Sequence, residues 1–118
     1  MKRIIDYFLV EWKNRKGRKP LLLRGARQVG KTHAVRALGK TFAHFVEINL
    51  ESNEAARKII EKDLDVARII LQLSELLQTK IEPGSTLFFI DEIQNVPKAI
   101  ITLRYFYEQM PELHVIAA

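Results

Sequence analysis

The sequence predicts an α/β fold with three layers, in which helices cover both faces of a parallel sheet. Short apolar segments alternate with longer segments of helical periodicity, which is typical of strand–helix–strand units. A glycine-rich loop follows the first apolar segment, and an acidic pair follows the third. Ligands of parallel sheets bind at the carboxyl ends of the strands, so both features are expected at one edge. The expected strands are residues 21–23, 45–50, 87–90 and 114–118.

The first expected element is an amphipathic helix over residues 3–15, with basic residues toward its C-terminal end, where the helix dipole favours them. Its apolar positions are Ile4, Ile5, Phe8, Leu9 and Trp12. Gly17 and Pro20 are expected to end it, because glycine suits a helix C-cap and proline cannot continue a helix. The apolar side of this helix should anchor it in the core.

Residues 25–32 match the phosphate-loop pattern G-x-x-x-x-G-K-[ST] at each fixed position. The loop lies between the strand at residues 21–23 and a helix expected over residues 31–42, the context that the pattern requires. Glycines let successive N–H groups turn inward, Lys31 supplies a point charge for the β- and γ-phosphates, and the Thr32 hydroxyl can ligate Mg²⁺. The residues expected to hold phosphates are Gly25, Ala26, Arg27, Gln28, Val29, Gly30, Lys31 and Thr32. The competing interpretation is a plain glycine turn with a solvated Lys31.

A second candidate element follows the apolar strand at residues 87–90, which should be buried on both faces. Asp91 and Glu92 come directly after it, about sixty residues beyond the phosphate loop. Asp91 would hold Mg²⁺ through water, and Glu92 would orient and deprotonate the attacking water. Lys31 and Glu92 are then the catalytic residues. The alternative is a pair of solvated acids at a strand end.

The rest of the chain supplies further helices and the end of the sheet. These helices are expected over residues 53–62, 65–78 and 97–110. Ser52 or Asn53 is expected to cap the first of them, and Pro97 opens the last. The sequence stops inside the apolar strand at residues 114–118 without a turn signal. We therefore expect residues 1–118 to be the N-terminal part of a larger domain, truncated after its fourth strand.

Composition limits the classes of protein to which the chain can belong. The 118 residues contain no cysteine, which excludes disulfides and thiolate metal sites. Asp6 interrupts the apolar stretch that a signal peptide needs, and no apolar run approaches the ~20 residues of a membrane span. A soluble, cytoplasmic protein without a membrane partner is expected.

The net charge of +5 is unevenly distributed along the chain. Residues 1–40 hold 12 Lys and Arg against 2 acids, whereas residues 41–118 hold 7 against 12. A cluster of five basic residues lies before the phosphate loop, namely Lys13, Arg15, Lys16, Arg18 and Lys19. They indicate either a patch that binds nucleic acid or a solvated helix end near an anionic nucleotide. The second interpretation is preferred, because no aromatic side chain except Trp12 is interleaved with them.

The strings G-A-R-Q-V-G-K-T at residues 25–32 and D-E-I-Q at residues 91–94 resemble those of a prokaryotic AAA+-like P-loop ATPase family. Members of that family join an N-terminal ATPase domain to a C-terminal domain of unknown function. The resemblance covers essentially the whole chain. It implies ATP and Mg²⁺ as cofactors and the strand order 5-1-4-3-2, with the strand at residues 114–118 between the first and the third. It also implies that the backbone N–H of His33 touches the α-phosphate.

The same resemblance assigns a role to Asn49. Asn49 lies near the end of the second expected strand, where AAA+ proteins usually carry a polar residue that holds the catalytic glutamate inactive. A hydrogen bond to backbone at the strand end explains Asn49 equally well. The helix over residues 3–15 either anchors the core or walls the adenine pocket.

The expected function is Mg²⁺-dependent ATP hydrolysis by the intact protein. Residues 1–118 alone should hydrolyse ATP weakly or not at all, because no sensor residue or arginine finger can be assigned in them. The alternatives are a nucleotide-dependent interaction switch and a nucleic-acid-binding module that uses the basic N-terminal half. The leucines at residues 21–23 are expected on an open strand edge, which predicts self-association. The alternative is that the helix over residues 3–15 folds over this edge and shields it.

Overall fold

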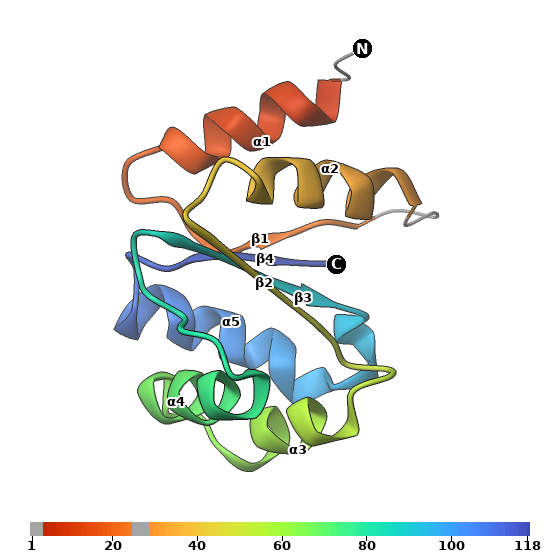
Figure 1. The fold of residues 1–118 in the computed structure, drawn as a ribbon, viewed down its shortest axis with the longest axis vertical. Helices are drawn as coiled ribbons and strands as arrows, with labels where there is room; N and C mark the ends of the chain where they lie inside the picture. The colour runs from red at the N-terminus through yellow and green to blue at the C-terminus, as the bar shows by residue number, and fades with distance from the viewer. Residues whose placement is uncertain (1–3, 25–28) are drawn as a thin grey trace.

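A four-stranded, all-parallel sheet lies at the centre of the computed structural model, which describes residues 4–24 and 29–118 (Figure 1). Within these residues the strands are β1 (Leu21–Leu22), β2 (His44–Asn49), β3 (Thr86–Asp91) and β4 (His114–Ala117). Their order across the sheet is β1-β4-β3-β2. The expected α/β fold is confirmed, and so is the insertion of the last strand between the first and the third.

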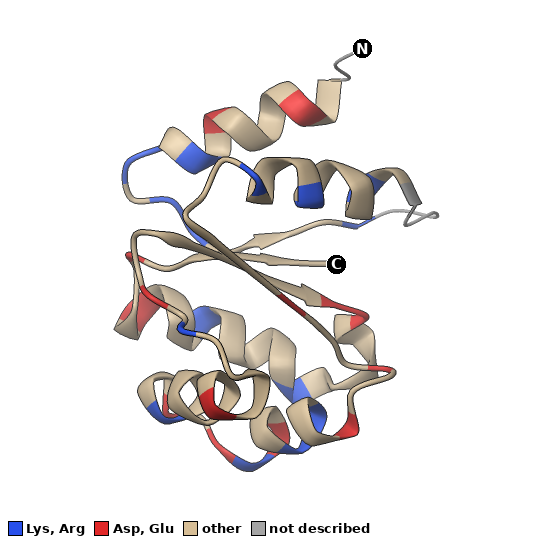
Figure 2. Cartoon of the chain, in the orientation of Figure 1, with Lys and Arg blue, Asp and Glu red and all other residues tan. Residues whose placement is uncertain are grey.

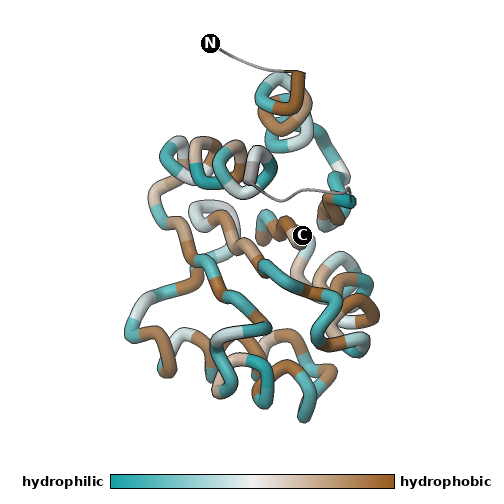
Figure 3. The backbone as a smooth tube through the Cα atoms, turned by 90° about the vertical axis from the view of Figure 1, so that its right-hand side faces the viewer, coloured by the Kyte–Doolittle hydropathy of each residue, from teal (hydrophilic) through white to brown (hydrophobic). Residues whose placement is uncertain are grey.

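Helices cover both faces of this sheet and give the three expected layers. They are α1 (Ile4–Asn14), α2 (Val29–Gly39), α3 (Glu54–Lys62), α4 (Val66–Leu77) and α5 (Pro97–Gln109), with a short 3₁₀ helix, η1 (Ile93–Asn95), before α5. α1 and α2 lie on one side of the sheet and α3, α4 and α5 on the other, as the front and side views show (Figure 1, Figure 3). None of the helices in the described ranges is long and apolar enough to cross a bilayer.

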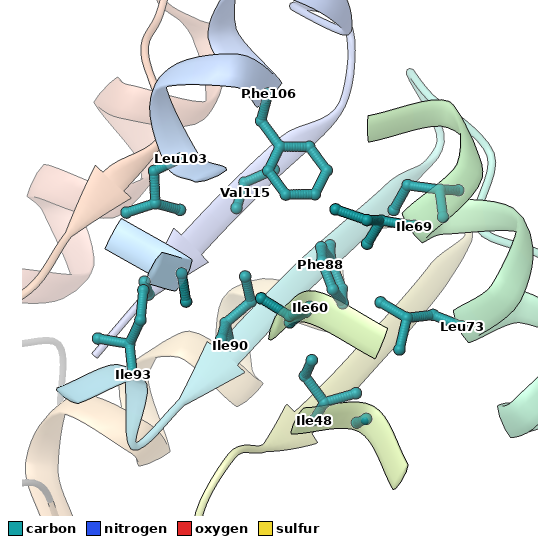
Figure 4. Packing of buried hydrophobic residues seen from close by; sticks show 14 of the residues in the cluster. Ile48, Ile60, Ile69, Leu73, Phe88, Ile90, Ile93, Leu103, Phe106 and Val115 are labelled. Atoms are coloured by element: carbon teal, nitrogen blue, oxygen red, sulfur yellow. The ribbon is translucent and has the colours of Figure 1, made fainter. Parts of the chain in front are cut away.

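β3 is buried along its whole length because helices cover it from both sides. Its side chains alternate between two apolar clusters. Phe88 and Ile90 join the larger cluster, to which α3, α4 and α5 contribute (Figure 4). Leu87 and Phe89 join the smaller cluster under α1 and α2. Asp91 continues the alternation of Leu87 and Phe89, so it lies on the face of the sheet that α2 covers.

Three differences from the sequence-based expectation bear on the site. α2 begins at Val29 rather than at residue 31, so the helix already includes the end of the phosphate-loop motif. η1 has no counterpart in the expectation, and it forms because Glu92 turns the chain sharply out of β3. β1 has two residues rather than three, although the Leu23 N–H still donates to the Ala117 carbonyl at 2.8 Å.

Candidate functional site

The candidate site lies at the edge of the sheet where β1, β2 and β3 end. α2 starts at this edge, and β2 and β3 finish level with each other because Asn49 pairs with Asp91 in register. Four expected phosphate-binding residues, Gly25, Ala26, Arg27 and Gln28, lie outside the described residues. The remaining ones, Val29, Gly30, Lys31, Thr32 and His33, begin α2. The start of a helix carries the positive end of the helix dipole, which favours a bound anion.

Lys31 is enclosed in a way that is unusual for a lysine. Its Nζ atom is buried, and among the described residues no group accepts a hydrogen bond from it. An enclosed ammonium without an acceptor is unfavourable, because it has lost water without gaining hydrogen bonds. A phosphate group would supply the missing acceptors and the opposite charge. Lys31 therefore fits an anionic ligand at this edge.

Asp91, the last residue of β3, is nearly buried, and its Oδ1 accepts a hydrogen bond from the Glu92 N–H at 2.9 Å. Burial raises the pKa of Asp91, and this hydrogen bond opposes the rise. Of the surrounding charges, Glu92 and Glu47 also raise the pKa of this carboxyl, and Arg36 lowers it. A cation would stabilise the ionised form. Since Mg²⁺ is commonly bound through one or two carboxylates together with phosphate oxygens, Asp91 and the Thr32 hydroxyl fit it.

Glu92 has a backbone conformation that is uncommon for a residue with a side chain. Its φ of 56° and ψ of 44° lie in the left-handed region, which costs about 1–2 kcal/mol for residues other than glycine. The turn is held by its carbonyl, which accepts from the Asn95 N–H at 3.2 Å, and by its Oε2, which accepts from Gln94 Nε2 at 3.0 Å. Such strain is frequent at functional sites. It leaves Glu92 half-buried beside Asp91.

The side chain of Asn49 organises the turn that follows β2. Its Oδ1 accepts hydrogen bonds from the N–H groups of Glu51 at 2.8 Å and Ser52 at 3.1 Å. The backbone contact expected as one explanation of Asn49 is therefore present. Asn49 also pairs in register with Asp91, the residue before Glu92. A hydrogen bond from Asn49 to the Glu92 carboxylate would be donated by the amide NH₂ of Asn49.

His33 is exposed and lines a groove of about 830 Å³ between α1 and α2. The groove is lined by Asp6, Tyr7, Leu9, Val10 and Glu11 of α1 and by His33, Ala34, Ala37, Leu38 and Thr41 on the side of α2. Its volume lies in the range of small-molecule sites. Trp12 of α1 is buried, as expected for a core anchor, and so is Leu9. Ile4 and Phe8 are exposed, so the expectation that they anchor the core is wrong. The other alternative, that α1 walls a base pocket, would use this groove.

The basic segment before β1 lies at the other end of the sheet from the candidate site (Figure 2). Lys13 Nζ donates to the Thr41 hydroxyl at 2.8 Å and lies 4.3 Å from the centre of the Phe42 ring. Arg18 Nη2 donates to the Glu112 carbonyl at 3.1 Å. These contacts join α1 and the following loop to their neighbours, which favours the structural interpretation over a nucleic-acid surface.

Two charged residues beside Asp91 carry no expectation from the sequence. Arg36 of α2 and Glu47 of β2 form an ion pair, with Nη2 and Oε2 2.8 Å apart. The sequence indicates that both residues lie near the candidate site, because Arg36 follows Thr32 by one helical turn and Glu47 precedes Asn49 by two strand positions. Their contact with each other could be predicted only once it was known that α2 packs against β2.

Comparison with known proteins agrees with this geometry. A family model described as an AAA domain matches residues 17–118, which include all the described elements except α1. Searches of curated proteins and of solved structures found no significant match. The matched region covers most of the chain and confirms the expected kind of family. The chain therefore belongs to the AAA domain family of P-loop ATPase-like proteins and is a nucleotide-binding domain of that kind.

Proposed function

We propose that this domain binds ATP together with Mg²⁺ and hydrolyses it in the intact protein. The enclosed Nζ of Lys31 carries the proposal, because it needs an anionic acceptor at the edge where ligands of parallel sheets bind. Lys31 would contact the β- and γ-phosphates, and residues 25–33 would donate backbone N–H groups to the phosphate chain. Thr32 and Asp91 would hold Mg²⁺, which when bound neutralises charge on the phosphate oxygens.

In the proposed reaction, water attacks the γ-phosphorus and Glu92 accepts a proton from it. The bond between the γ-phosphorus and the β–γ bridging oxygen breaks, giving ADP and inorganic phosphate. Lys31 stabilises the negative charge that develops on the leaving ADP. Glu92 directly follows Asp91, so the acid that handles the water lies beside the acid that holds the metal. Asn49 is the candidate residue to restrain Glu92.

The test compares two lysines at opposite ends of α2. Lys31→Ala should abolish ATP binding in a calorimetric titration, because the phosphate charge is then under-compensated. Lys40→Ala removes an exposed lysine just after α2 and should bind ATP as the wild type does. Both variants should keep the wild-type circular dichroism spectrum, since neither removes an apolar contact. Unchanged ATP affinity in Lys31→Ala would exclude the phosphate-loop assignment.

A further inference from the structure

The strongest feature that the proposed reaction leaves unused is the ion pair between α2 and β2. Arg36 donates two hydrogen bonds to the Glu47 carboxylate, from Nε to Oε1 at 2.9 Å and from Nη2 to Oε2 at 2.8 Å. The Glu47 side chain is 23% exposed and that of Arg36 is 57% exposed. Such paired, parallel bonds fix the geometry of both partners, and partial burial reduces screening by solvent.

The position of this pair relates it to the proposed metal site. Arg36 lies one helical turn beyond Thr32 on α2. Glu47 pairs in register with Phe89, two positions before the pairing of Asn49 with Asp91. Strand side chains alternate, so Glu47, Asn49, Phe89 and Asp91 share one face. Phe89 packs in the cluster to which α2 contributes, so this is the face that α2 covers.

We propose that the Arg36–Glu47 pair is a positioning element of the magnesium–nucleotide site, which holds α2 against β2 behind Thr32 and balances the charge beside Asp91. This inference rests on the proposed function, because it concerns the same site. Neither residue is proposed to touch the nucleotide. Their effect is exerted through the placement of Thr32 and through the electrostatic potential at Asp91.

The charge balance predicts opposite changes of ATP affinity in the two single variants. Arg36→Gln leaves the charge of Glu47 unpaired, so ATP without Mg²⁺, a polyanion, should bind about three- to tenfold more weakly. Glu47→Gln leaves the charge of Arg36 unpaired, so metal-free ATP should bind about three- to tenfold more tightly. The gain in affinity on adding Mg²⁺ should increase in Arg36→Gln and decrease in Glu47→Gln. The double variant should bind metal-free ATP as the wild type does, because the charge is again balanced. It should gain less affinity from Mg²⁺, because the hydrogen bonds that hold α2 against β2 behind Thr32 are lost.

The experiment is a titration with ATP in the presence of EDTA and again with Mg²⁺, for the wild type, the two single variants and the double variant. Arg68→Gln is the matched control, because it breaks another paired Arg–carboxylate contact, with Asp63 between α3 and α4. It should leave both affinities unchanged. Repeating the titrations at about 0.5 M salt should shrink the opposite shifts, as expected for a screened charge effect.

The outcomes separate this inference from the proposed function. If the wild type does not bind ATP, both fail. If the wild type binds ATP but both single variants weaken metal-free binding, or neither differs from Arg68→Gln, the charge-balancing role is wrong and the proposed function stands. If either variant is too unstable to titrate, the exchanged pair Arg36→Glu with Glu47→Arg decides the question. It keeps the net charge and should bind metal-free ATP within about threefold of the wild type, and a larger loss would overturn the inference.

Discussion

The carboxyl group of Asp91 is buried, and burial favours its uncharged form. Burial raises the pKa of this carboxyl above its ordinary value. For an acid, a folded-state pKa above the unfolded value means that the folded chain binds the proton more tightly. The free energy of unfolding contributed by Asp91 therefore falls as the pH rises through these two pKa values. At neutral pH the ionised carboxylate therefore destabilises the fold, and a bound cation would offset this effect.

Replacing this carboxylate by its neutral isostere should stabilise the protein. Asp91→Asn keeps the oxygen that accepts from the Glu92 N–H and removes the buried charge. Its melting temperature at pH 7 should exceed that of the wild type, and the difference should shrink as the pH falls toward 4, because Asp91 then becomes protonated. The variant should also lose the part of ATP affinity that depends on Mg²⁺. A lower melting temperature at pH 7, measured by calorimetry, would contradict this account of Asp91.

A substitution at Glu92 tests whether ATP hydrolysis can be separated from ATP binding. Glu92→Gln removes the basic oxygen but keeps an amide oxygen that can accept from Gln94 Nε2, so the left-handed turn should persist. ATP affinity should stay within about twofold of the wild type, and the hydrolysis rate of the intact protein should fall about 10²- to 10⁴-fold. Wild-type turnover by the variant would exclude Glu92 as the base. Binding without turnover in both proteins would favour the nucleotide-dependent switch.

At the scale of elements, His114 fastens α1 to the start of β4. Its Nε2 lies 3.2 Å from the Lys13 carbonyl, and its Nδ1 lies 2.9 Å from Arg18 Nη2. A carbonyl only accepts and a guanidinium only donates, so the ring is neutral with its proton on Nε2. Its ring also meets those of Trp12 and Phe42 edge-on, at 5.7 and 4.8 Å between centroids. Protonation would place a third positive charge beside Lys13 and Arg18.

This contact predicts a loss of stability in mild acid. Burial first, and then the charges of Arg18 and Lys13, lower the pKa of His114 from 6.5 to about 4, although its hydrogen bond to Lys13 opposes the shift. Between these values the unfolded chain binds a proton that the folded chain does not. The free energy of unfolding should therefore fall by about 2–3 kcal/mol as the pH decreases through this range. Urea denaturation at several pH values measures it.

His114→Gln provides the control for this pH dependence, because glutamine offers a donor and an acceptor but does not titrate. The slope between pH 6.5 and 4.5 should flatten in the variant. The range stops at 4.5 because Asp63 and Glu82, whose pKa values are lowered by Arg68 and Lys80, lose their contributions mainly at lower pH. An unchanged slope would show that His114 does not control stability in this range.

Local sequence patterns predicted the helices and strands well where burial or helix capping depends on residues within one short segment. The continuous apolar run at residues 87–90 predicted a strand covered on both faces, and Asn53 caps α3 by accepting from the Ala56 N–H at 3.0 Å. The strain at Glu92 and the environment of His114 could not be predicted in this way. Both depend on which strand lies beside which, and so do the partners of Arg36 and Glu47.

At the scale of the whole molecule, β1 forms one border of the described sheet. It pairs with β4 on one side, and the sheet order gives it no second neighbour among the described strands. Leu21 and Leu23 pack against the cluster under α1 and α2, and Leu22 packs against the other cluster, so the helices cover the faces of β1. Unpaired edges attract further strands unless charge, proline or a bulge blocks them. Pro20 protects only the start of this edge.

Exposed apolar residues of α5 extend the same border. Lys19 Nζ lies 5.6 Å from the centre of the Tyr107 ring, which places that side of α5 beside the start of β1. Ile100 lies two helical turns before Tyr107 and shares this side, and both residues are exposed. A strand edge flanked by apolar side chains is a typical association surface.

We therefore expect residues 1–118 to self-associate through β1 and this side of α5 at tens of micromolar, as measured by light scattering during gel filtration. Ile100→Lys should shift the population toward the monomer, because a charge would be desolvated in the contact. Leu71→Lys is the matched control, since Leu71 is an exposed leucine of α4 on another part of the surface, and this variant should associate as the wild type does. A wild-type chain that stays monomeric would exclude the open-edge model. Equal effects of the two lysine substitutions would instead show that association depends on net charge rather than on the β1 edge.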